Sequence, residues 1–413
     1  MKRIGFISTR IAGTDGVSLE TFKWYQVLER NGYECFFFAG QLETPPDHSF
    51  LEPKAHFEHP DVLEIQQDCF GKRVRRPSLS SKVHELRNYL KAKLYVFYKD
   101  FNLDMIIVEN ALAIPMNVPL GMAITEFIAE TGIPTIAHHH DFAWERDRFL
   151  ICAIQDYVHY AFPPTHPSIR HVTINSKASR QLSFRRGLSN VVIPNVYDFA
   201  NSPPPSDKVD ALRKTLGFKK DDLFILQPTR VVPRKWIERS VELVYLMELP
   251  NPRLVISHKS GDEGSLYEKR VNEYAERLGV ELIFIGDKVG ASRCFKSNHD
   301  HDFTIDDVYQ CADLVTYPSG YEGFGNAFVE AIYFKKPLVV NRYSIFVEDI
   351  EPIGFDVVSF DGFVTHEIID QVKEFLNSGA RASSMEKNYR LGQANLSYEV
   401  LEKRLFPIIR SFS

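Results

Sequence analysis

The sequence has few cysteines and no long apolar run. Its five cysteines in 413 residues are scattered, odd in number and without CxxC spacing, which excludes a disulfide framework and a zinc ribbon and favours a reducing compartment. A transmembrane helix needs about 18 or more consecutive apolar residues, and no segment supplies them. The apolar part of the opening MKRIGFIST is too short for a signal peptide. We therefore expect a soluble, cytoplasmic protein.

The chain also lacks a positive net charge, with 49 Lys and Arg residues against 54 Asp and Glu residues. The formal net charge is −5, which argues against general nucleic-acid binding. A basic cluster, Lys72, Arg73, Arg75 and Arg76, lies in a Pro-rich polar stretch over residues 41–80. We interpret that stretch as a solvated loop. The alternative is an anion contact for an acidic acceptor or a membrane headgroup, although we expect no membrane contact from the chain as a whole.

Strands alternating with helices of 12 to 17 residues predict parallel sheets. The first strand, Arg3–Ser8, ends in a loop with Gly13 and Gly16, and a helix and a second strand follow. This is the start of a doubly wound unit, whose ligand site lies at the carboxyl ends of the strands. The glycine spacing is not GxGxxG, so the nicotinamide and flavin fingerprint is absent. With 44% hydrophobic and 25% charged residues, a chain of this length predicts two domains.

The most informative stretch is SGYEGFGNAFVE, Ser319–Glu330. It follows the predicted strand Leu314–Thr316 and leads into an apolar helix, an order that gathers free backbone N–H groups and the positive end of a helix dipole at one point. Such a point favours a diphosphate. Glu330 lies roughly 7 Å further along the helix axis, where its carboxylate can accept hydrogen bonds from a ribose. Glu322, in the loop, would face the sugar.

A second informative stretch, AHHHDFAWERDRF, follows the predicted strand Pro134–Ala137. Its polar cluster, His138, His139, His140 and Asp141, suggests a metal site. Adjacent residues on an extended segment point to opposite faces, however, so all four can hardly bind one ion. We expect no metal here. Another acidic pair, Asp300 and Asp302, superficially resembles a metal-binding DxD motif, but it lies in a polar insert late in the chain, and we interpret it as a loop.

Two cations, Arg230 and Lys235, are five residues apart around a Pro that begins a helix. Permanent charges near a helix N-terminus make a strong diphosphate clamp. The alternative is a solvated helix cap.

The two acids at Glu322 and Glu330, with EGFGN between them, resemble the E-x7-E signature of family 4 retaining glycosyltransferases, which have the GT-B fold. The resemblance implies two Rossmann-like, doubly wound parallel-sheet domains facing a cleft. It also implies that the loop residues Gly323, Phe324, Gly325 and Asn326 hold the donor together with Glu330.

The resemblance extends to the first half of the chain. Gly16 matches a glycine that lies against the donor diphosphate in this family. Counting from Pro134, His140 matches a histidine that contacts the transferred sugar and helps orient the acceptor hydroxyl. The residues implied on the acceptor side are Asp141, Trp144, Glu145 and Arg146.

The second half carries further matches. Arg230 and Lys235 resemble the family's R-x4-K, whose cations stabilise the departing nucleotide diphosphate, although Trp236 replaces the usual Gly. Asn195 belongs to a Pro-Asn pair that ends the N-terminal domain, with Val196 in place of Gly. Gly286, after a predicted strand, should border the nucleotide base.

We therefore predict an acceptor-side domain at 1–198, a linker at 199–208 where Pro and Ser crowd NSPPPSDK, and a donor-binding domain at 209–396. By resemblance, the C-terminal helix at 397–413 packs back on the first domain.

The implied reaction is a retaining transfer of a hexose from a nucleotide diphosphate sugar, of the GDP-mannose or UDP-glucose type, to a hydroxyl of a small or glycan acceptor. The basic residues and the histidine stretch favour an acidic or phosphorylated acceptor, such as one of the glucosylglycerate type. Arg230 and Lys235 take the place of a metal, and we expect no cofactor. The alternatives are another GT-B protein, an epimerase or a phosphorylase, and a nucleotide-sugar binder without activity.

Overall fold

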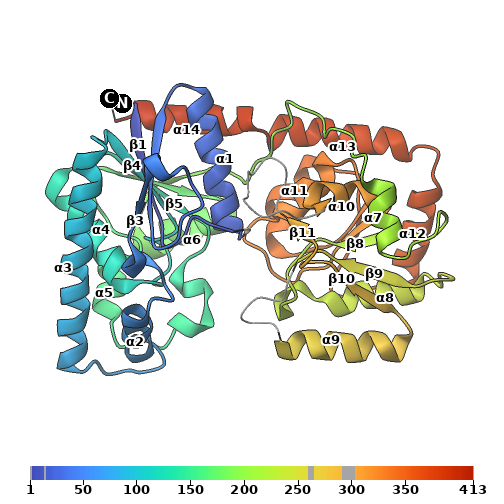
Figure 1. Ribbon diagram of the computed structural model, residues 1–413, viewed down its shortest axis with the longest axis horizontal. Helices are drawn as coiled ribbons and strands as arrows, with labels where there is room; N and C mark the ends of the chain where they lie inside the picture. Colours follow the sequence, from blue (N-terminus) through green and yellow to red (C-terminus); the bar gives the residue numbers. More distant parts are fainter. Residues whose placement is uncertain (1, 14, 259–264, 291–302, 413) are drawn as a thin grey trace. The chain divides into compact units, whose positions relative to one another are not determined.

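The computed structural model describes residues 2–13, 15–258, 265–290 and 303–412. The chain divides into two compact units. The first unit is Met1–Pro194 with Leu401–Ser413, and the second unit is Asn195–Val400. Each is built around one parallel sheet with helices on both faces, as Figure 1 shows. This confirms the predicted fold class, two doubly wound α/β domains.

The sheet of the first unit has the order β3-β2-β1-β4-β5-β6-β7, and every described pairing in it is parallel. Its strands are β1 Arg3–Ile7, β2 Glu34–Ala39, β3 Ser49–Leu51, β4 Met105–Glu109, β5 Thr135–His139, β6 Ile169–Thr173 and β7 Asn190–Val192. The chain runs outward from β1 to β3 and then returns to β4 on the other side of β1. The order of the strands reverses between β1 and β4, and at such a switch point the loops diverge and leave room for a ligand.

One face of this sheet is covered by α2 Pro60–Cys69, α3 Pro77–Asp100, α4 Val118–Thr131 and α5 Gln155–Ala161. The opposite face carries α1 Gly16–Arg30, α6 Ser176–Arg186 and the end of α14 Tyr398–Arg410. The interpretation of residues 41–80 as a solvated loop holds for the basic cluster at 72–76, which lies outside helices and strands and is largely exposed. It is wrong for the residues before the cluster, because β3 and α2 lie within this range. In α2, Val62, Ile65 and Cys69 recur at helical spacing and are buried in the core.

The end of the chain, Leu401–Ser413, belongs to the first unit. On α14, Glu402 accepts a hydrogen bond from the Arg30 Nε at 2.9 Å, and the ring of Phe406 stacks on that of Tyr33 with 6.0 Å between centroids. These contacts hold the end of the chain against α1 and the loop that follows it.

The sheet of the second unit has the order β10-β9-β8-β13-β14-β15 and is also parallel. Its strands are β8 Ile225–Gln227, β9 Arg253–Ile256, β10 Glu281–Phe284, β13 Leu314–Tyr317, β14 Leu338–Asn341 and β15 Val358–Phe360. A separate pair joins β11 Val289–Gly290 to β12 Phe303–Thr304. The switch point lies between β8 and β13, so the loops after these two strands should hold the ligand.

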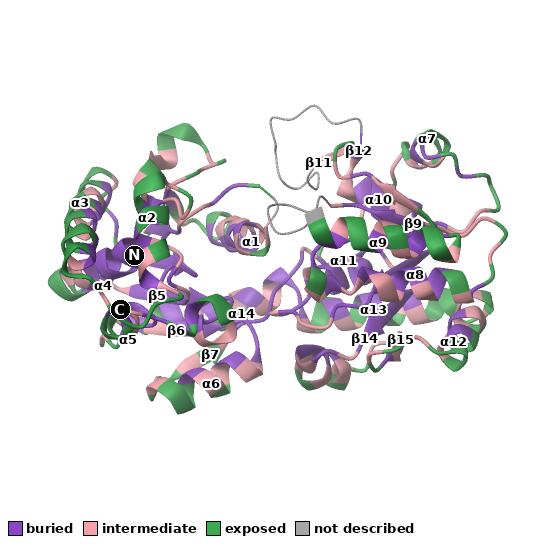
Figure 2. Ribbon diagram, turned by 90° about the horizontal axis from the view of Figure 1, so that it is seen from below, coloured by how far each residue is buried: buried purple, intermediate pink, exposed green. Residues whose placement is uncertain are grey.

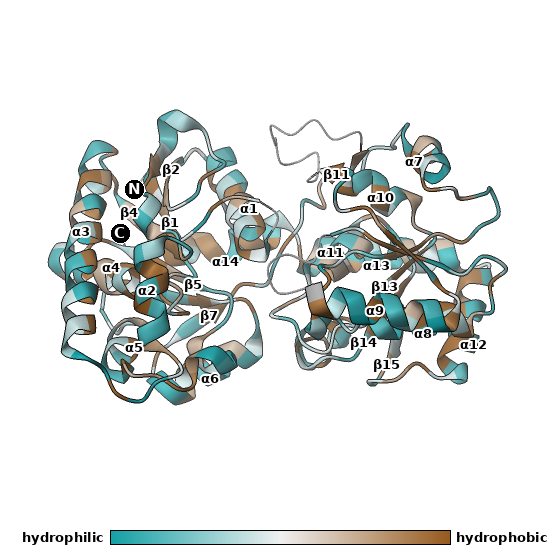
Figure 3. Cartoon of the chain, turned by 60° about the horizontal axis from the view of Figure 1, so that its bottom comes forward, coloured by the Kyte–Doolittle hydropathy of each residue, from teal (hydrophilic) through white to brown (hydrophobic). Residues whose placement is uncertain are grey.

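The helices of the second unit are α7 Val209–Thr215, α8 Ile237–Leu246, α9 Ser265–Leu278, α10 Ile305–Cys311, α11 Asn326–Tyr333, α12 His366–Asn377 and α13 Arg381–Asn395. Helices α8, α9 and α12 share one core with the sheet. In Figure 3 the outer side of α9 is hydrophilic while the strands behind it are hydrophobic, as expected for an amphipathic helix on a buried sheet.

The predicted linker needs a correction, because residues 199–208 belong to the second unit. The ring of Phe199 packs edge-on against Tyr389, with 5.2 Å between centroids. Further along, the Ser206 N–H donates to the side chain of Gln310 at 2.7 Å, and the same side chain donates back to the Pro204 carbonyl at 2.9 Å. Proline and serine here mark an extended segment tied to α10 rather than a free tether, and the change of unit comes earlier, after Pro194.

Two further features bear on the predictions. The four described cysteines, Cys35, Cys69, Cys152 and Cys311, are buried free thiols. Asp300 and Asp302 lie outside the described residues. Within the described part of the chain, no helix is both long enough and apolar enough to cross a bilayer.

Candidate active site

The cationic loop of the second unit follows β8. A single 3-10 turn, Pro233–Lys235, precedes α8, and Trp236 between them is in the left-handed region at φ +48°. Glycine adopts this conformation most readily, which explains why the resembling family has Gly here. In this chain the indole instead packs on Gly320, where an added Cβ would come within 2.5 Å of the ring. Trp236, in place of the family's Gly, therefore connects the loops after β8 and β13.

The centre of these two loops is the carboxylate of Glu322. One oxygen, Oε1, accepts a hydrogen bond from the Lys235 ammonium, and the other, Oε2, accepts one from the Arg234 guanidinium at 2.9 Å. Glu322 and Lys235 are both buried. The structure thus brings together two of the predicted residues and adds Arg234, which the sequence analysis missed because the R-x4-K spacing draws attention to Arg230.

The charges in this cluster are strongly coupled. Burial alone would raise the pKa of Glu322, but the charges of Lys235 and Arg234 outweigh it and lower the pKa to about 2. Burial lowers the pKa of Lys235, and the charge of Glu322 opposes that change. The result is a carboxylate fixed in its ionised form by two cations.

Arg230 lies at the same sheet edge and is exposed. Beside it, two residues after the end of β9, is His258, a residue that sequence reasoning missed. Burial lowers the pKa of His258 to about 4, and the charges of Lys235 and Arg230 add to the effect. His258 is therefore neutral at pH 7 and can offer an imidazole hydrogen bond next to two cations. Its position two residues after a strand adjacent to β8 is the signal that could have found it.

The glycine-rich loop leads into α11 as predicted. Gly325 has φ +131°, and a Cβ added to it would come within 2.4 Å of the Tyr343 hydroxyl. That hydroxyl donates to the Phe324 carbonyl at 2.7 Å. The close approach requires glycine at 325, and it fixes the loop so that the first turn of α11 opens at this edge of the sheet.

Glu330 is the fifth residue of α11, as expected. The Tyr309 hydroxyl donates to its Oε2 at 2.8 Å. At the start of the same helix, the Asn326 Oδ1 accepts a hydrogen bond from the Asn195 side chain at 2.6 Å. Gly286 lies in the turn after β10, and Gly323 is partly exposed in the loop after β13. The predicted donor-binding residues of the second unit thus lie in the loops after β8, β10 and β13 or on α11, and Asn195 contacts the first residue of α11. Their roles stay predictions.

In the first unit, the corresponding edge holds a carboxylate between two imidazoles. Glu109, the last residue of β4, lies next to His138 of β5 in the parallel register. Its Oε2 is 2.9 Å from the His138 Nδ1 and 3.2 Å from the His140 Nε2. All three side chains are buried, and Trp24 stacks on His138 with 4.2 Å between ring centroids.

The alternation expected of a strand is observed. His138 and His140 share one face, while His139 points to the other and pairs with His171, Nε2 to Nδ1, at 2.9 Å. Burial lowers the pKa of His139 well below its usual range and that of His171 to about 4. This second pair is therefore neutral, with one ring donating to the other.

Glu109, His138 and His140 have ligand atoms within 4.8 Å of one another, so within the described residues they form a cluster that could hold a metal ion. Hydrogen bonds among the three already account for their geometry. Burial opposes the charge on Glu109, but the charge of His138 and the hydrogen bonds from both imidazoles lower its pKa to about 2. Glu109 was not a sequence candidate, since it lies on another strand, far from the histidines in the chain.

The predicted acceptor residues separate into two groups. Asp141 accepts a hydrogen bond from Asn110 at 2.8 Å and one from the Arg146 Nε at 2.5 Å, and Asn110 also accepts from the His140 N–H at 3.0 Å. These residues are joined to the histidine cluster. Trp144 is not: its indole N–H donates to Gln181 on α6 at 2.6 Å, and it stacks on Phe142.

The remaining prediction for the first unit, Gly16, is the first residue of α1. Asp15 caps this helix, accepting hydrogen bonds from the N–H groups of Val17 and Ser18 at 3.1 and 3.2 Å. Gly16 therefore lies at a helix N-terminus on the switch point between β1 and β4.

Two parallel doubly wound units define the architecture of GT-B glycosyltransferases. Sucrose-phosphate synthase from Thermosynechococcus elongatus has a similar structure over 100% of both chains, with a TM-score of 0.67 and 15% sequence identity.

The sequence comparisons give the family. The profile of glycosyl transferases group 1 matches residues 208–391. Mannosylglucosylglycerate synthase from Petrotoga mobilis is 32% identical over 394 residues, covering 88% of each protein. The Thermotoga maritima protein described by the same words is 30% identical over 444 residues, covering 97% of this chain and 98% of its own. The chain belongs to the glycosyl transferases group 1 and is a glycosyltransferase with the GT-B fold.

Proposed function

We propose that this chain transfers a mannosyl group from GDP-mannose to a hydroxyl of glucosylglycerate, with retention of the anomeric configuration. The observation that carries the transferase chemistry is the Glu322 carboxylate fixed by Lys235 and Arg234, beside the N-terminus of α11. The choice of mannose and of a glucosylglycerate acceptor is supported by the two relatives at 32% and 30% identity, described as mannosylglucosylglycerate synthases.

In the proposed reaction the bond between the sugar and the phosphate breaks, and negative charge grows on the departing diphosphate. Arg230 and Lys235 are cations at the same sheet edge, and the first N–H groups of α11 add the positive end of a helix dipole. A site arranged in advance to meet this charge lowers the barrier without a metal ion. Removing one such contact typically costs about 3 kcal/mol of transition-state stabilisation.

The environment of Glu322 favours front-face attack by the acceptor over a covalent intermediate. Both of its oxygens already accept hydrogen bonds from cations, and its pKa of about 2 makes it a weak nucleophile. In the proposed route, the acceptor hydroxyl attacks the anomeric carbon from the side that the phosphate leaves. The leaving phosphate oxygen takes the acceptor's proton. Glu322 acts near the sugar by holding Lys235 in place.

Glu330 is proposed to hold the ribose of the donor, with its carboxylate oriented by Tyr309. Gly286, Gly323 and Asn326 are proposed to shape the rest of the donor site. On the acceptor side we propose His140 as the residue that contacts the transferred sugar, positioned by Glu109 from behind.

A screen of donors and acceptors tests this function. GDP-mannose, UDP-glucose and ADP-glucose are each incubated with glucosylglycerate, and release of nucleoside diphosphate is measured with NMR of the product. We expect release with GDP-mannose that depends on the acceptor, and an α-linked mannoside. Donor binding without release of nucleoside diphosphate would indicate a non-catalytic binder. Conversion of the donor in the absence of an acceptor would indicate an epimerase. A β-linked product would contradict retention.

A further inference from the structure

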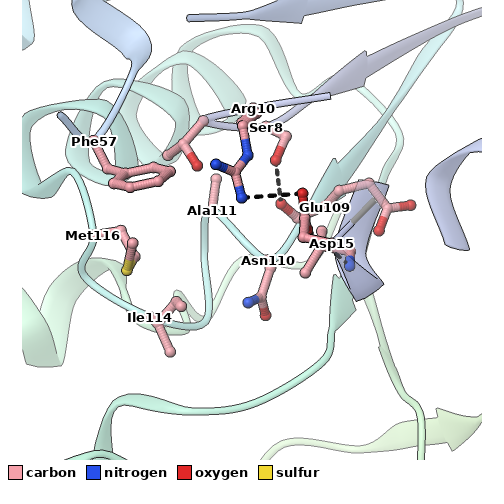
Figure 4. Close-up of a pocket in the computed structure, with 11 residues that line it drawn as sticks. Ser8, Arg10, Asp15, Phe57, Glu109, Asn110, Ala111, Ile114 and Met116 are labelled. Carbon is pink, nitrogen blue, oxygen red and sulfur yellow. Dashed lines mark hydrogen bonds and ion pairs between the residues drawn. The ribbon is translucent and has the colours of Figure 1, made fainter. Parts of the chain in front are cut away.

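The first unit has a pocket at its switch point, drawn in Figure 4. The loop after β1 supplies one wall, and the loop after β4 supplies the other. The lining residues that carry the argument are Arg10, Asp15, Phe57, Glu109, Asn110 and Met116. Glu109 belongs to the histidine cluster and Asn110 is hydrogen-bonded to it, so the pocket lies directly against that cluster.

Arg10 is the one Lys or Arg among the described residues that line this pocket. Its Nη2 is 3.1 Å from the Asp15 Oδ2, and its guanidinium carbon lies over the Phe57 ring, 5.2 Å from the centroid. The ion pair and the ring hold the planar group in one orientation. A guanidinium carries five N–H donors, and the contact with Asp15 occupies only part of them.

The opposite wall is formed by Glu109 and Asn110, at the end of β4. Glu109 is fully buried, and its Oε1 has no hydrogen-bond partner, although Oε2 is shared by two imidazoles. This oxygen is itself buried, so its missing partner does not mark a ligand contact, and Glu109 acts on the pocket through its charge. The Asn110 amide donates to Asp141 and accepts from the His140 N–H, and its nitrogen carries a second N–H.

We propose that this pocket binds the carboxylate end of the acceptor, with the carboxylate on Arg10. The proposal rests on the proposed function, since it names how that reaction's acceptor is recognised. One permanent, planar cation matches a monoanionic carboxylate in a bidentate contact. The nearby carboxylates of Asp15 and Glu109 disfavour a dianionic phosphate in the same place.

Arg10 then determines acceptor specificity. The measurement is kcat/KM for glucosylglycerate divided by kcat/KM for glucosylglycerol, in which a neutral CH2OH replaces the carboxylate. Arg10→Ala should lower this ratio by about 10- to 100-fold, because a charge-assisted contact is lost for one acceptor and not for the other. Arg10→Lys should restore part of it. Arg180→Ala, which removes an exposed cation on α6, should leave the ratio within about twofold.

Binding is measured separately from turnover, by calorimetric titration of glucosylglycerate into the wild type and Arg10→Ala, with melting curves to verify folding. Weaker binding in Arg10→Ala supports the site even if no mannosyl transfer occurs, an outcome that would remove the proposed function alone. Equal binding to both proteins, or an unchanged ratio, would overturn the site. Tighter binding of glucosyl-3-phosphoglycerate than of glucosylglycerate would overturn the choice of a carboxylate.

Discussion

The two units place a buried glutamate at the same topological position and surround it differently. Glu109 is the last residue of the strand at the first switch point, and its partners are imidazoles. Glu322 follows the corresponding strand at the second, and its partners are an ammonium and a guanidinium. Both glutamates have a pKa of about 2. The fold thus determines where an ionised carboxylate lies, and the neighbouring residues determine which ligand it can help to bind.

The two sites differ in net charge, and we therefore expect them to bind different ligands. In the second unit, Lys235, Arg234 and the nearby Arg230 outnumber Glu322, so the edge is electropositive and suits a diphosphate. In the first unit, His139 and His171 are held neutral, and the pocket has one cation, Arg10, against two carboxylates. Such a site suits hydroxyl groups and a single carboxylate.

The largest effect should come from removing the cations of the second unit. Arg230→Ala and Lys235→Ala are each expected to lower kcat by about 100-fold or more, since each loses a charge contact made in the transition state. Arg230 is exposed, so its variant should melt close to the wild type. Lys235→Ala should also be destabilised, by roughly 3–5 kcal/mol, because it leaves Glu322 buried with one cation fewer. Near-normal turnover in Arg230→Ala would remove that residue from the site.

The matching change in the first unit is Glu109→Gln, which keeps the shape and removes the charge. His140 should lose its orientation, and kcat should fall by about 10- to 100-fold. A variant with lower stability but an unchanged kcat would limit Glu109 to a structural role.

A smaller effect concerns stability against pH. The pKa of His171 is about 4 in the folded chain and near 6.5 when unfolded, so the unfolded state binds more protons between these values. Stability should therefore fall as the pH decreases from 6.5 to 4, by roughly 3 kcal/mol from this residue. Denaturant titrations across that range should give a shallower slope for His171→Gln than for the wild type. Equal slopes would show that His171 is not held neutral.

The smallest effect is expected from chelation. Exhaustive treatment with EDTA should leave the rate within about twofold, since cations of the chain meet the diphosphate charge. Loss of activity that manganese or magnesium restores would contradict the metal-free account. It would direct attention to Glu109, His138 and His140, whose ligand atoms lie close enough for an ion.

Local order could be predicted from the sequence, and long-range pairing could not. The strand, glycine loop and helix around Glu322 follow from residue types that are adjacent in the chain, and so does the alternation of His138 and His139. The partner of both His138 and His140, Glu109, depends on the register of β4 against β5, which no local pattern reveals. Likewise, the 3-10 turn that brings Arg234 to Glu322 arises from packing between two loops.

The same reasoning explains the incorrect linker. A run of Pro and Ser reads as a tether because it lacks apolar residues, but Ser206 and Pro204 are held by the side chain of one residue on α10, Gln310. Backbone hydrogen bonds to a distant side chain leave no trace in composition. The position of the domain boundary therefore required the structure.

The central claim is that the two glutamates around α11 serve different ends of one donor. Calorimetric titration of GDP against Glu322→Gln and Glu330→Gln, paired with initial rates on GDP-mannose, tests it most directly. Glu330→Gln should weaken GDP binding by about 10-fold or more, because the ribose loses charge-assisted hydrogen bonds. Glu322→Gln should keep GDP affinity, since it removes a negative charge beside the diphosphate, and should lower turnover instead. Weaker GDP binding in Glu322→Gln than in Glu330→Gln would contradict the account and reverse the donor along this helix.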